Sequence, residues 1–159
     1  MNQEAIRYAK RALNPFLFKT GMLYKLPSVV FWGIKIVSLD EHSCSVNIPY
    51  SWRTKNPFKS IYFAALAGAA ELSTGALCQL MLAGKSPHAM LVVDFRAEYF
   101  KKADSAVIFT CNQGKELESA LQSLVNPGDT TQFKMVSTGF NQENKLIVKI
   151  TVTWSFKRK

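Results

Sequence analysis

One acidic residue is a candidate for chemistry because of the segment that surrounds it. Residues 61–83 (IYFAALAGAAELSTGALCQLMLA) contain Glu71 as their only side chain that is charged at neutral pH. A carboxylate among apolar neighbours loses its hydration, so it needs a bonding partner or has a functional role. Two interpretations therefore stay open: a structural carboxylate bonded to a buried hydroxyl or to a basic residue, and a functional one.

The segment around Glu71 predicts a long helix. It has no proline, and Ser60 is a candidate N-cap while Gly84 is a candidate stop. On a helix, the residues three, four and seven positions from Glu71 share its face, and all of them are small: Ala64, Ala67, Gly68, Thr74, Gly75 and Cys78. Such a face lets a sheet, a helix of a partner subunit or a ligand come close.

The same segment is long and apolar enough to raise the question of a membrane span. Its Ala and Gly content, the central Glu71 and the alternating strands on both sides favour a buried helix covered by a sheet. We therefore expect no membrane span.

The flanking sequence supplies the elements that would position this helix. We expect an amphipathic helix over 2–13 that ends at Asn14-Pro15, and a short helix over 116–125. Apolar and polar residues alternate in the expected strands, which are 29–40, 43–50, 91–99, 107–111, 133–140 and 146–156. In the third of these, Leu91, Val93, Phe95, Ala97 and Tyr99 are expected to share one face. Hairpin connections predict an antiparallel sheet, and the fold class is α+β.

Length and composition restrict the class of protein. The 159 residues are 48% hydrophobic and suffice for a single domain over 1–159, with a helical N-terminal extension of about 1–27. Three cysteines without a CxxC pair and only two histidines support neither a disulfide framework nor a metal site. Because the N-terminus is polar and helical rather than signal-like, we expect a cytoplasmic protein.

The net charge of +9 is unevenly distributed. Residues 1–60 carry nine Lys or Arg against three acids, and 126–159 carry six against two, whereas 61–125 are nearly balanced. No basic run exceeds three residues, and the aromatic residues fall largely on strand positions, which disfavours a nucleic-acid groove. A small polyanionic ligand fits this distribution better.

Two stretches resemble a known superfamily. The stretch NPFKSIYFAALAGAAE (residues 56–71) is similar to the signature of hotdog-fold acyl-CoA thioesterases of the phenylacetate-degradation type. There an Asn precedes a His-Gly-Gly by six residues, and an Asp or Glu follows that His by nine; here Asn56, Tyr62 and Glu71 have this spacing. The stretch VVDFRAEYFKKADSAVIF (residues 92–109) resembles the third strand, the loop and the fourth strand of these enzymes. The resemblance covers roughly residues 28–156 and is closest to a bacterial branch of the superfamily.

The resemblance implies an antiparallel sheet wrapped around the long helix, and hydrolysis of an acyl-CoA thioester. Glu71 would be the general base or nucleophile, and Asn56 would position water or substrate. The helix start would offer backbone N–H groups to the thioester oxygen, and small residues would line the acyl site. The substrate-binding set so implied is Tyr62, Phe63, Ala64, Ala67, Gly68 and Thr74.

The chain departs from the family where Tyr62, Phe63 and Ala64 replace His-Gly-Gly. The glycines let a carbonyl approach the backbone, so Phe63 would close or redirect the site. Tyr62 would either supply an O–H donor or pack as an ordinary aromatic residue.

Basic side chains near the helix start and the third strand are candidates for the coenzyme A phosphates, although each is also compatible with a solvated surface. They are Arg53, Lys55, Lys59, Arg96, Lys101 and Lys102. We interpret Cys78 as a small buried residue and His88 as structural or solvated.

Three functions are therefore compared. The first is an acyl-CoA thioesterase with two sites at the interface of a homodimer or a dimer of dimers, with coenzyme A as part of the substrate and no separate cofactor. The second is a non-catalytic protein that binds an acyl thioester or a lipid, favoured by the missing His-Gly-Gly. The third is a peripheral membrane or nucleic-acid binder explained by charge alone, and we expect no nucleic-acid partner.

Overall fold

The computed structural model describes residues 1–159 and contains one antiparallel sheet and one long helix at its centre. The helices are α1 (Gln3–Leu13), α2 (Pro15–Lys25), α3 (Pro27–Trp32), α4 (Phe63–Leu82) and α5 (Gly114–Leu121). The strands are β1 (Lys35–Leu39), β2 (Cys44–Ile48), β3 (His88–Tyr99), β4 (Val107–Cys111), β5 (Thr130–Asn141) and β6 (Leu146–Arg158). The α+β class and the antiparallel sheet are confirmed.

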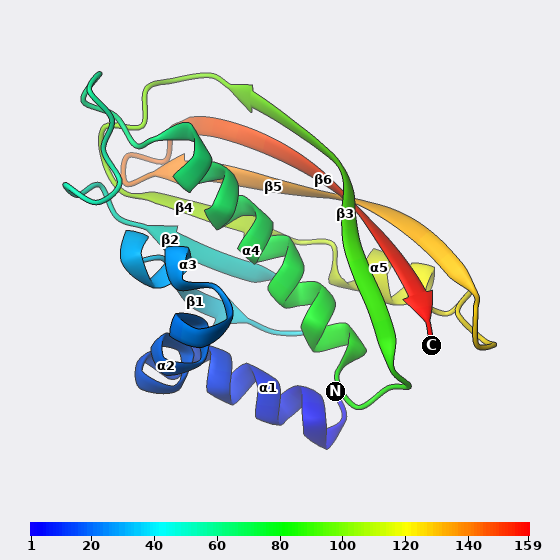
Figure 1. Cartoon of the computed structure of the whole chain (residues 1–159). Helices are drawn as coiled ribbons and strands as arrows, with labels where there is room; N and C mark the ends of the chain where they lie inside the picture. Colours follow the sequence, from blue (N-terminus) through cyan, green and yellow to red (C-terminus); the bar gives the residue numbers. More distant parts are fainter.

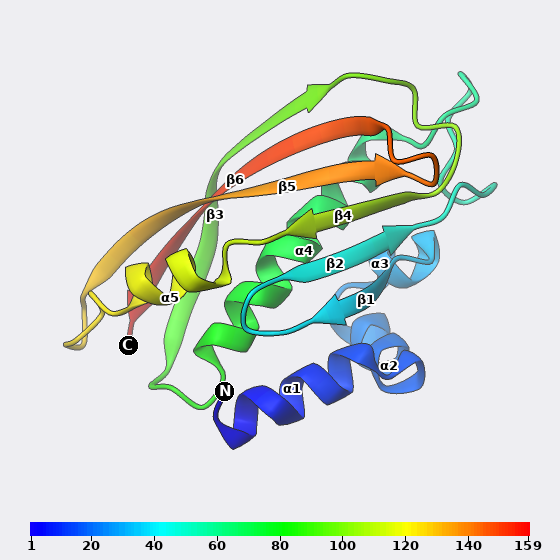
Figure 2. The same ribbon diagram turned by 180° about the vertical axis from the view of Figure 1, so that it is seen from behind.

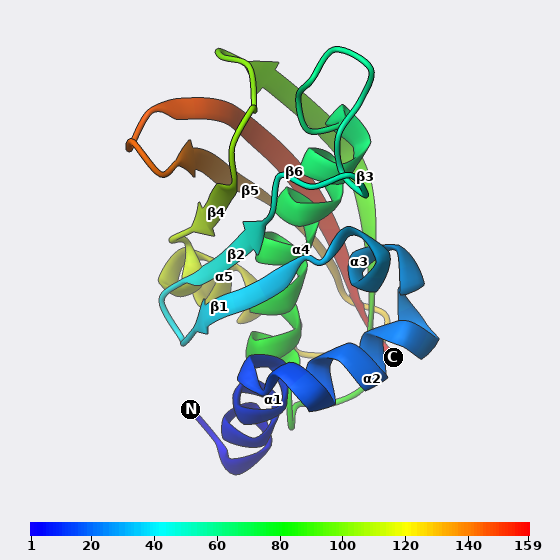
Figure 3. The same cartoon turned by 90° about the vertical axis from the view of Figure 1, so that its left-hand side faces the viewer.

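The six strands form one sheet in the order β1-β2-β4-β5-β6-β3, with every neighbouring pair antiparallel. Helix α4 lies across the inner face of this sheet, and α1–α3 gather beside the β1 end (Figure 1). Figure 2 shows the sheet from its other side, with α4 behind it. Viewed from the side, the strands curve around α4 (Figure 3).

The core forms where α4 meets the strands. Alternate residues of β6, from Val148 to Phe156, are buried against the helix, as the sequence pattern predicts. Two polar contacts fix the position of α4: the Ser73 and Ser137 hydroxyls lie 2.7 Å apart, and Trp154 Nε1 donates to Thr74 Oγ1 at 3.0 Å. By length and composition α4 alone could cross a membrane, but 67% of its most apolar window is buried inside the protein.

The N-terminal region differs from the sequence-based expectation. Residues 29–32 belong to α3 rather than to a strand, and β1 begins only at Lys35. Pro27 at the first turn and Gly33 at the left-handed C-cap (φ 71°) bound α3, and these local signals outweigh the β-branched Val29 and Val30. The segment after Asn14 is also helical, because the Asn14 side chain accepts hydrogen bonds from the first N–H groups of α2.

The starts of two other helices differ from the sequence-based expectation. Helix α4 begins at Phe63 with Tyr62 as its N-cap, so the prediction of Ser60 as the cap is wrong; the Ser60 hydroxyl donates to Asn56 instead. Helix α5 lies earlier than expected, because Gly114 packs where a Cβ atom would be 2.0 Å from the Glu41 carbonyl oxygen. Only a glycine allows that close approach to the turn between β1 and β2.

Strand β3 contains a bulge that the alternation did not reveal. The pairing with β6 shifts between Val92 and Asp94, so β3 has one extra residue there relative to β6. Val92 lies opposite Trp154 and Phe95 opposite Val152, which places these two residues on the inner face. Leu91 lies on the other face and is 66% exposed, so the prediction that it shares a face with Phe95 and Tyr99 is wrong.

Candidate active site

Glu71 lies near the middle of α4, on the side of the helix that the sheet leaves partly open. It is half-buried, and its carboxylate forms no hydrogen bond and no ion pair. Burial raises the pKa of this carboxyl group above its ordinary value. The structural interpretation of Glu71 required a bonded partner, and the folded chain supplies none.

Small residues make room for the Glu71 carboxylate. A Cβ atom on Gly75 would lie 3.3 Å from Glu71 Oε1 and 3.2 Å from Trp154 Cζ2, so the carboxylate and the indole ring both lie over Gly75. The hydroxyl of Thr74 donates to the Glu71 carbonyl oxygen at 2.9 Å and accepts from Trp154. Thr74 is fully buried, so its hydroxyl fixes the helix against the sheet rather than facing an open site.

The rest of this helix face consists of residues with little side chain. Ala64 and Ala67 are half-buried, and Gly68 lies under the Trp32 ring, where a Cβ atom would be 3.0 Å from Cζ3. Trp32 belongs to α3, so the N-terminal helices cover part of the face that the sequence suggested for the acyl group.

The start of α4 presents two free backbone donors. The N–H groups of Ala65 and Leu66 both donate to the Tyr62 carbonyl oxygen, but those of Phe63 and Ala64 form no hydrogen bond. No side chain caps this end of the helix. A helix N-terminus with unpaired N–H groups stabilises negative charge on a nearby oxygen.

The rings of Tyr62 and Phe63 lie beside these donors and are exposed. They contact each other edge to face, with centroids 4.9 Å apart. The Tyr62 hydroxyl has no hydrogen-bond partner. Phe63 therefore stands at the mouth of the helix start, where the related motif has glycine.

Asn56 lies in the loop that precedes this helix end. Its Oδ1 accepts from the N–H groups of Phe58 and Ser60, at 3.0 and 3.2 Å, and from the Ser60 hydroxyl. Asn56 also lines a cavity of about 190 Å³ together with Phe63, Lys101 and Lys102. The fold thus brings Asn56, the helix start and two of the proposed phosphate-binding lysines to one place.

The other basic candidates do not join that cavity. Arg53 lines a different cavity beside α2 and α3. Lys55 lies on the loop where its backbone bridges to Ile61, and Lys59 occupies a turn with φ 58°. Arg96 lies on β3, 3.9 Å from Glu98. The six basic residues therefore form no single cluster within one chain.

Glu71 and the helix start are separated along the helix. Eight residues at the α-helical rise place them about 12 Å apart along the axis. Glu71 lines none of the cavities described above. Within one chain, the carboxylate and the free N–H groups therefore do not act on the same atom.

The family model for DUF4442, described as a domain of unknown function, matches residues 15–156. The chain belongs to the DUF4442 family. No curated protein matches the sequence. This DUF4442 chain carries its half-buried carboxylate and its free helix donors within the matched segment.

Solved structures share the fold across almost the whole length. A Pseudomonas aeruginosa protein of unknown function, PA5026, called a probable thioesterase, superposes with TM-score 0.75 at 13% identity, over 91% of this chain and 97% of its own. A putative thioesterase from Shewanella oneidensis gives 0.74 at 15%, over 94% and 97%. The Escherichia coli PaaI protein from the phenylacetic acid degradation operon gives 0.63 at 14%, over 96% of both chains. The DUF4442 chain therefore has the hotdog fold, and the fold implied by the sequence resemblance is confirmed.

The cysteine side chains of this DUF4442 chain are packed in the core. Cys44, Cys78 and Cys111 are buried, and burial raises the pKa of the Cys44 thiol to about 12 and that of Cys111 to about 11. The Cys78 thiol lies 3.4 Å from Met135 Sδ in the core, which confirms it as a small buried residue. No group of three or more His, Cys, Asp or Glu side chains is arranged to hold a metal ion.

Sequence reasoning missed two neighbours of the site. Trp154 falls in the expected strand 146–156, and its ring lies against the Gly75 position beside Glu71. Trp32 falls in the expected strand 29–40, but it belongs to α3 and covers Gly68. The six-residue helix α3 that carries Trp32 has Pro27 and Gly33 as its signals, and both were available in the sequence.

Proposed function

We propose that this protein is a thioester hydrolase in which Glu71 is the general base or nucleophile. The observation that carries the proposal is a half-buried carboxylate without a bonding partner on the open side of the central helix. A carboxylate whose pKa is raised by burial accepts a proton more readily at neutral pH, which suits it to activating water. The thioesterase descriptions of several proteins with this fold support the same class.

The free N–H groups of Phe63 and Ala64 are the proposed site for the developing oxyanion. Two unpaired donors at a helix N-terminus stabilise the negative charge that a thioester oxygen gains on attack. Lys101 and Lys102, beside the same helix end, would bind phosphate groups of coenzyme A, and the Asn56 amide would hold the substrate or water.

The Glu71 carboxylate and the free N–H groups at the start of α4 require two chains to form one site. Because Glu71 lies about 12 Å along the axis from the helix start, we infer that the Glu71 of one subunit acts beside the helix start of its partner. The open face of α4 and the unpaired edge of β3 are the surfaces available for such a homodimer.

The test is thiol release from a panel of saturated acyl-CoAs and aryl-CoAs, measured together with the binding of each thioester by calorimetry. We expect turnover of at least one thioester. Binding without turnover across the panel would instead favour the second candidate, a non-catalytic acyl-thioester-binding protein, because Phe63 stands where the related enzymes have glycine.

A further inference from the structure

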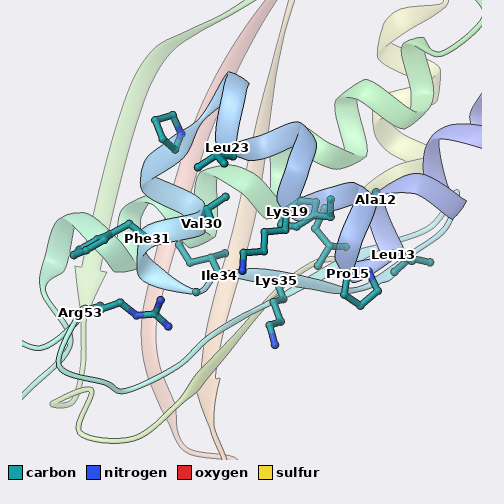
Figure 4. Close-up of a pocket in the computed structure, with 14 residues that line it drawn as sticks. Ala12, Leu13, Pro15, Lys19, Leu23, Val30, Phe31, Ile34, Lys35 and Arg53 are labelled. Atoms are coloured by element: carbon teal, nitrogen blue, oxygen red, sulfur yellow. The ribbon is translucent and has the colours of Figure 1, made fainter.

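A second cavity lies among the N-terminal helices, in a part of the chain that the proposed chemistry does not use. It has a volume of about 720 Å³ and is bounded by α1, α2, α3 and β1 (Figure 4). Neither Glu71 nor Asn56 lines it. Its size falls within the range of cavities that hold small organic ligands.

The walls of this cavity are mostly apolar. Phe18 and Leu23 of α2, Val30 and Phe31 of α3, and Ile34 of the loop between α3 and β1 contribute to them. Some of this apolar surface is uncovered, since Leu23 is 62% exposed. Phe31 contacts the Trp52 ring edge to face, with centroids 6.0 Å apart, and Trp52 is itself 73% exposed. Exposed aromatic and aliphatic side chains beside a cavity are typical of surfaces that bind apolar molecules.

Three cationic side chains line the same cavity, and no acidic side chain does. Lys19 comes from α2, Lys35 from β1 and Arg53 from the loop after β2. None of the three forms a side-chain hydrogen bond or an ion pair. The chain between Glu4 and Asp40, which supplies Lys19 and Lys35, contains no acidic residue.

A glycine leaves space for one of these cations. Gly33 has φ 71°, and a Cβ atom there would lie 3.2 Å from Arg53 Nη2 and 3.4 Å from Pro49 Cγ. The absence of a side chain at residue 33 leaves room for the guanidinium group at the cavity wall. The planar guanidinium group of Arg53 has the geometry for bidentate binding of an oxyanion.

We propose that this cavity binds a single-chain amphipathic anion, with its alkyl chain on the apolar wall and its carboxylate or phosphate at Lys19, Lys35 and Arg53. A neutral apolar ligand would contact the apolar wall but would leave the three cations unpaired. A small inorganic anion would leave the apolar wall in water. Only a molecule with both parts satisfies the whole cavity.

The first experiment measures displacement of a dansyl-labelled undecanoic acid from the full-length protein. We expect dodecanoate and dodecyl phosphate to displace the probe, dodecanol to do so about tenfold less well or worse, and inorganic phosphate not to displace it. Equal displacement by dodecanoate and dodecanol would overturn the proposal, because the cations would then play no part.

The second experiment uses matched charge reversals. The double variant Lys19→Glu with Lys35→Glu is expected to weaken dodecanoate binding by about tenfold or more. The control, Lys115→Glu with Lys134→Glu, makes the same change of net charge at two exposed lysines outside the cavity and should bind as the wild type does. Equal affinity of the two double variants would overturn the proposal.

A variant of the apolar wall and a vesicle-binding measurement complete the test. Leu23→Asp places a carboxylate on the apolar wall at an exposed position that tolerates it, so it should fold and still lose dodecanoate binding. Sedimentation with phosphatidylcholine vesicles, with and without phosphatidylglycerol, tests whether a two-chain bilayer lipid is the ligand instead. Dodecanoate binding without cosedimentation supports the single-chain ligand. Cosedimentation with the anionic vesicles and no displacement of the probe by dodecanoate would overturn the proposal. No binding in either arm would overturn the proposal.

Discussion

At the scale of single residues, Glu71 is the acidic group on which the proposed reaction depends. It is half-buried without a partner, and the small residue Gly75 allows Trp154 to lie beside it. Burial that raises the pKa of a carboxyl group also means that its ionised form is disfavoured in the folded chain. The folded state therefore binds this proton more tightly than the unfolded state does.

The resulting pH dependence can be tested with Glu71→Gln. Because the native state holds the extra proton, the stability that Glu71 contributes falls as pH rises from its ordinary pKa through the raised one. The neutral amide avoids this loss, so we expect the variant to melt at a higher temperature than wild type at neutral pH. The difference should vanish below the ordinary glutamate pKa.

Thermal melts over a pH series provide the measurement. Glu118→Gln, on the exposed surface of α5, is the matched control and should show no such trend. A Glu71→Gln variant that is less stable than wild type at neutral pH would mean that the carboxylate has a partner after all.

The residue that sequence could identify was Glu71, because a single carboxylate in an apolar helix is visible as a pattern. The family resemblance implied backbone donors at the helix start, where the N–H groups of Phe63 and Ala64 are indeed unpaired. The residue pattern alone favoured Ser60 as the cap and so an earlier helix start. The loop instead uses the Ser60 hydroxyl to bond Asn56, which moves the helix start by two residues.

At the scale of elements, the start of α4 is the feature with a chemical consequence. Phe63 is the first helical residue, and Tyr62 before it has φ −60° and ψ 133°, the extended conformation that a following proline requires. Proline is well tolerated at the first position of a helix. Phe63→Pro therefore removes one free donor without breaking an existing hydrogen bond.

We expect Phe63→Pro to lose about a hundredfold or more in kcat, the usual cost of one oxyanion donor, while its melting temperature stays close to that of wild type. Phe63→Ala removes the ring but keeps the N–H group, so it is the matched control. Equal kcat values for the two variants, measured by thiol release, would contradict the assignment of the Phe63 N–H group.

Packing between strands can be tested at Gly139. A Cβ atom there would lie 2.9 Å from both Phe109 Cε1 and Val107 Cγ1, so Gly139→Ala should destabilise the fold by about 1–3 kcal/mol. Gly21, inside α2, has nothing within 4 Å of its Cβ position, and Gly21→Ala should stabilise by about 0.5–1 kcal/mol. Chemical denaturation of both variants gives the two values, and the same sign for both would contradict this account of the packing.

Most elements could be predicted because their periodicity is strong, as in β6 and α4. The bulge in β3 could not, because Leu91, Val93 and Phe95 continue the alternation in sequence while the pairing with β6 shifts. Helix α3 was missed because Val29 and Val30 favour strands, whereas Pro27 and Gly33 bound a single short helix.

At the scale of the whole molecule, the sheet has an unpaired edge at β3 beside the open face of α4. The inner face of this edge carries Phe95 and Tyr99, which are 41% and 48% exposed. Such an edge is covered in most folded proteins. We expect light scattering at micromolar concentration to give at least twice the 17.8 kDa mass of one chain, and a monomer would contradict the two-chain site.

The two-chain site also predicts complementation. If Glu71 of one subunit acts with the helix start of its partner, then Glu71→Gln and Phe63→Pro chains are each impaired in both sites of a homodimer. Co-folding the two variants should restore about a quarter of wild-type activity, because half of the dimers are mixed and each mixed dimer has one intact site. Thiol release that stays at the level of the separate variants would contradict the shared site.

The ratio of kcat for Glu71→Gln to that of wild type, on the best thioester of the panel, tests the catalytic role of Glu71 most directly. The folded state and the mass of both proteins are checked in the same samples. We expect kcat to fall by about a hundredfold to ten-thousandfold with thioester binding retained, because the variant keeps the site but lacks the base. Turnover within about twofold of wild type would show that Glu71 is not the catalytic group.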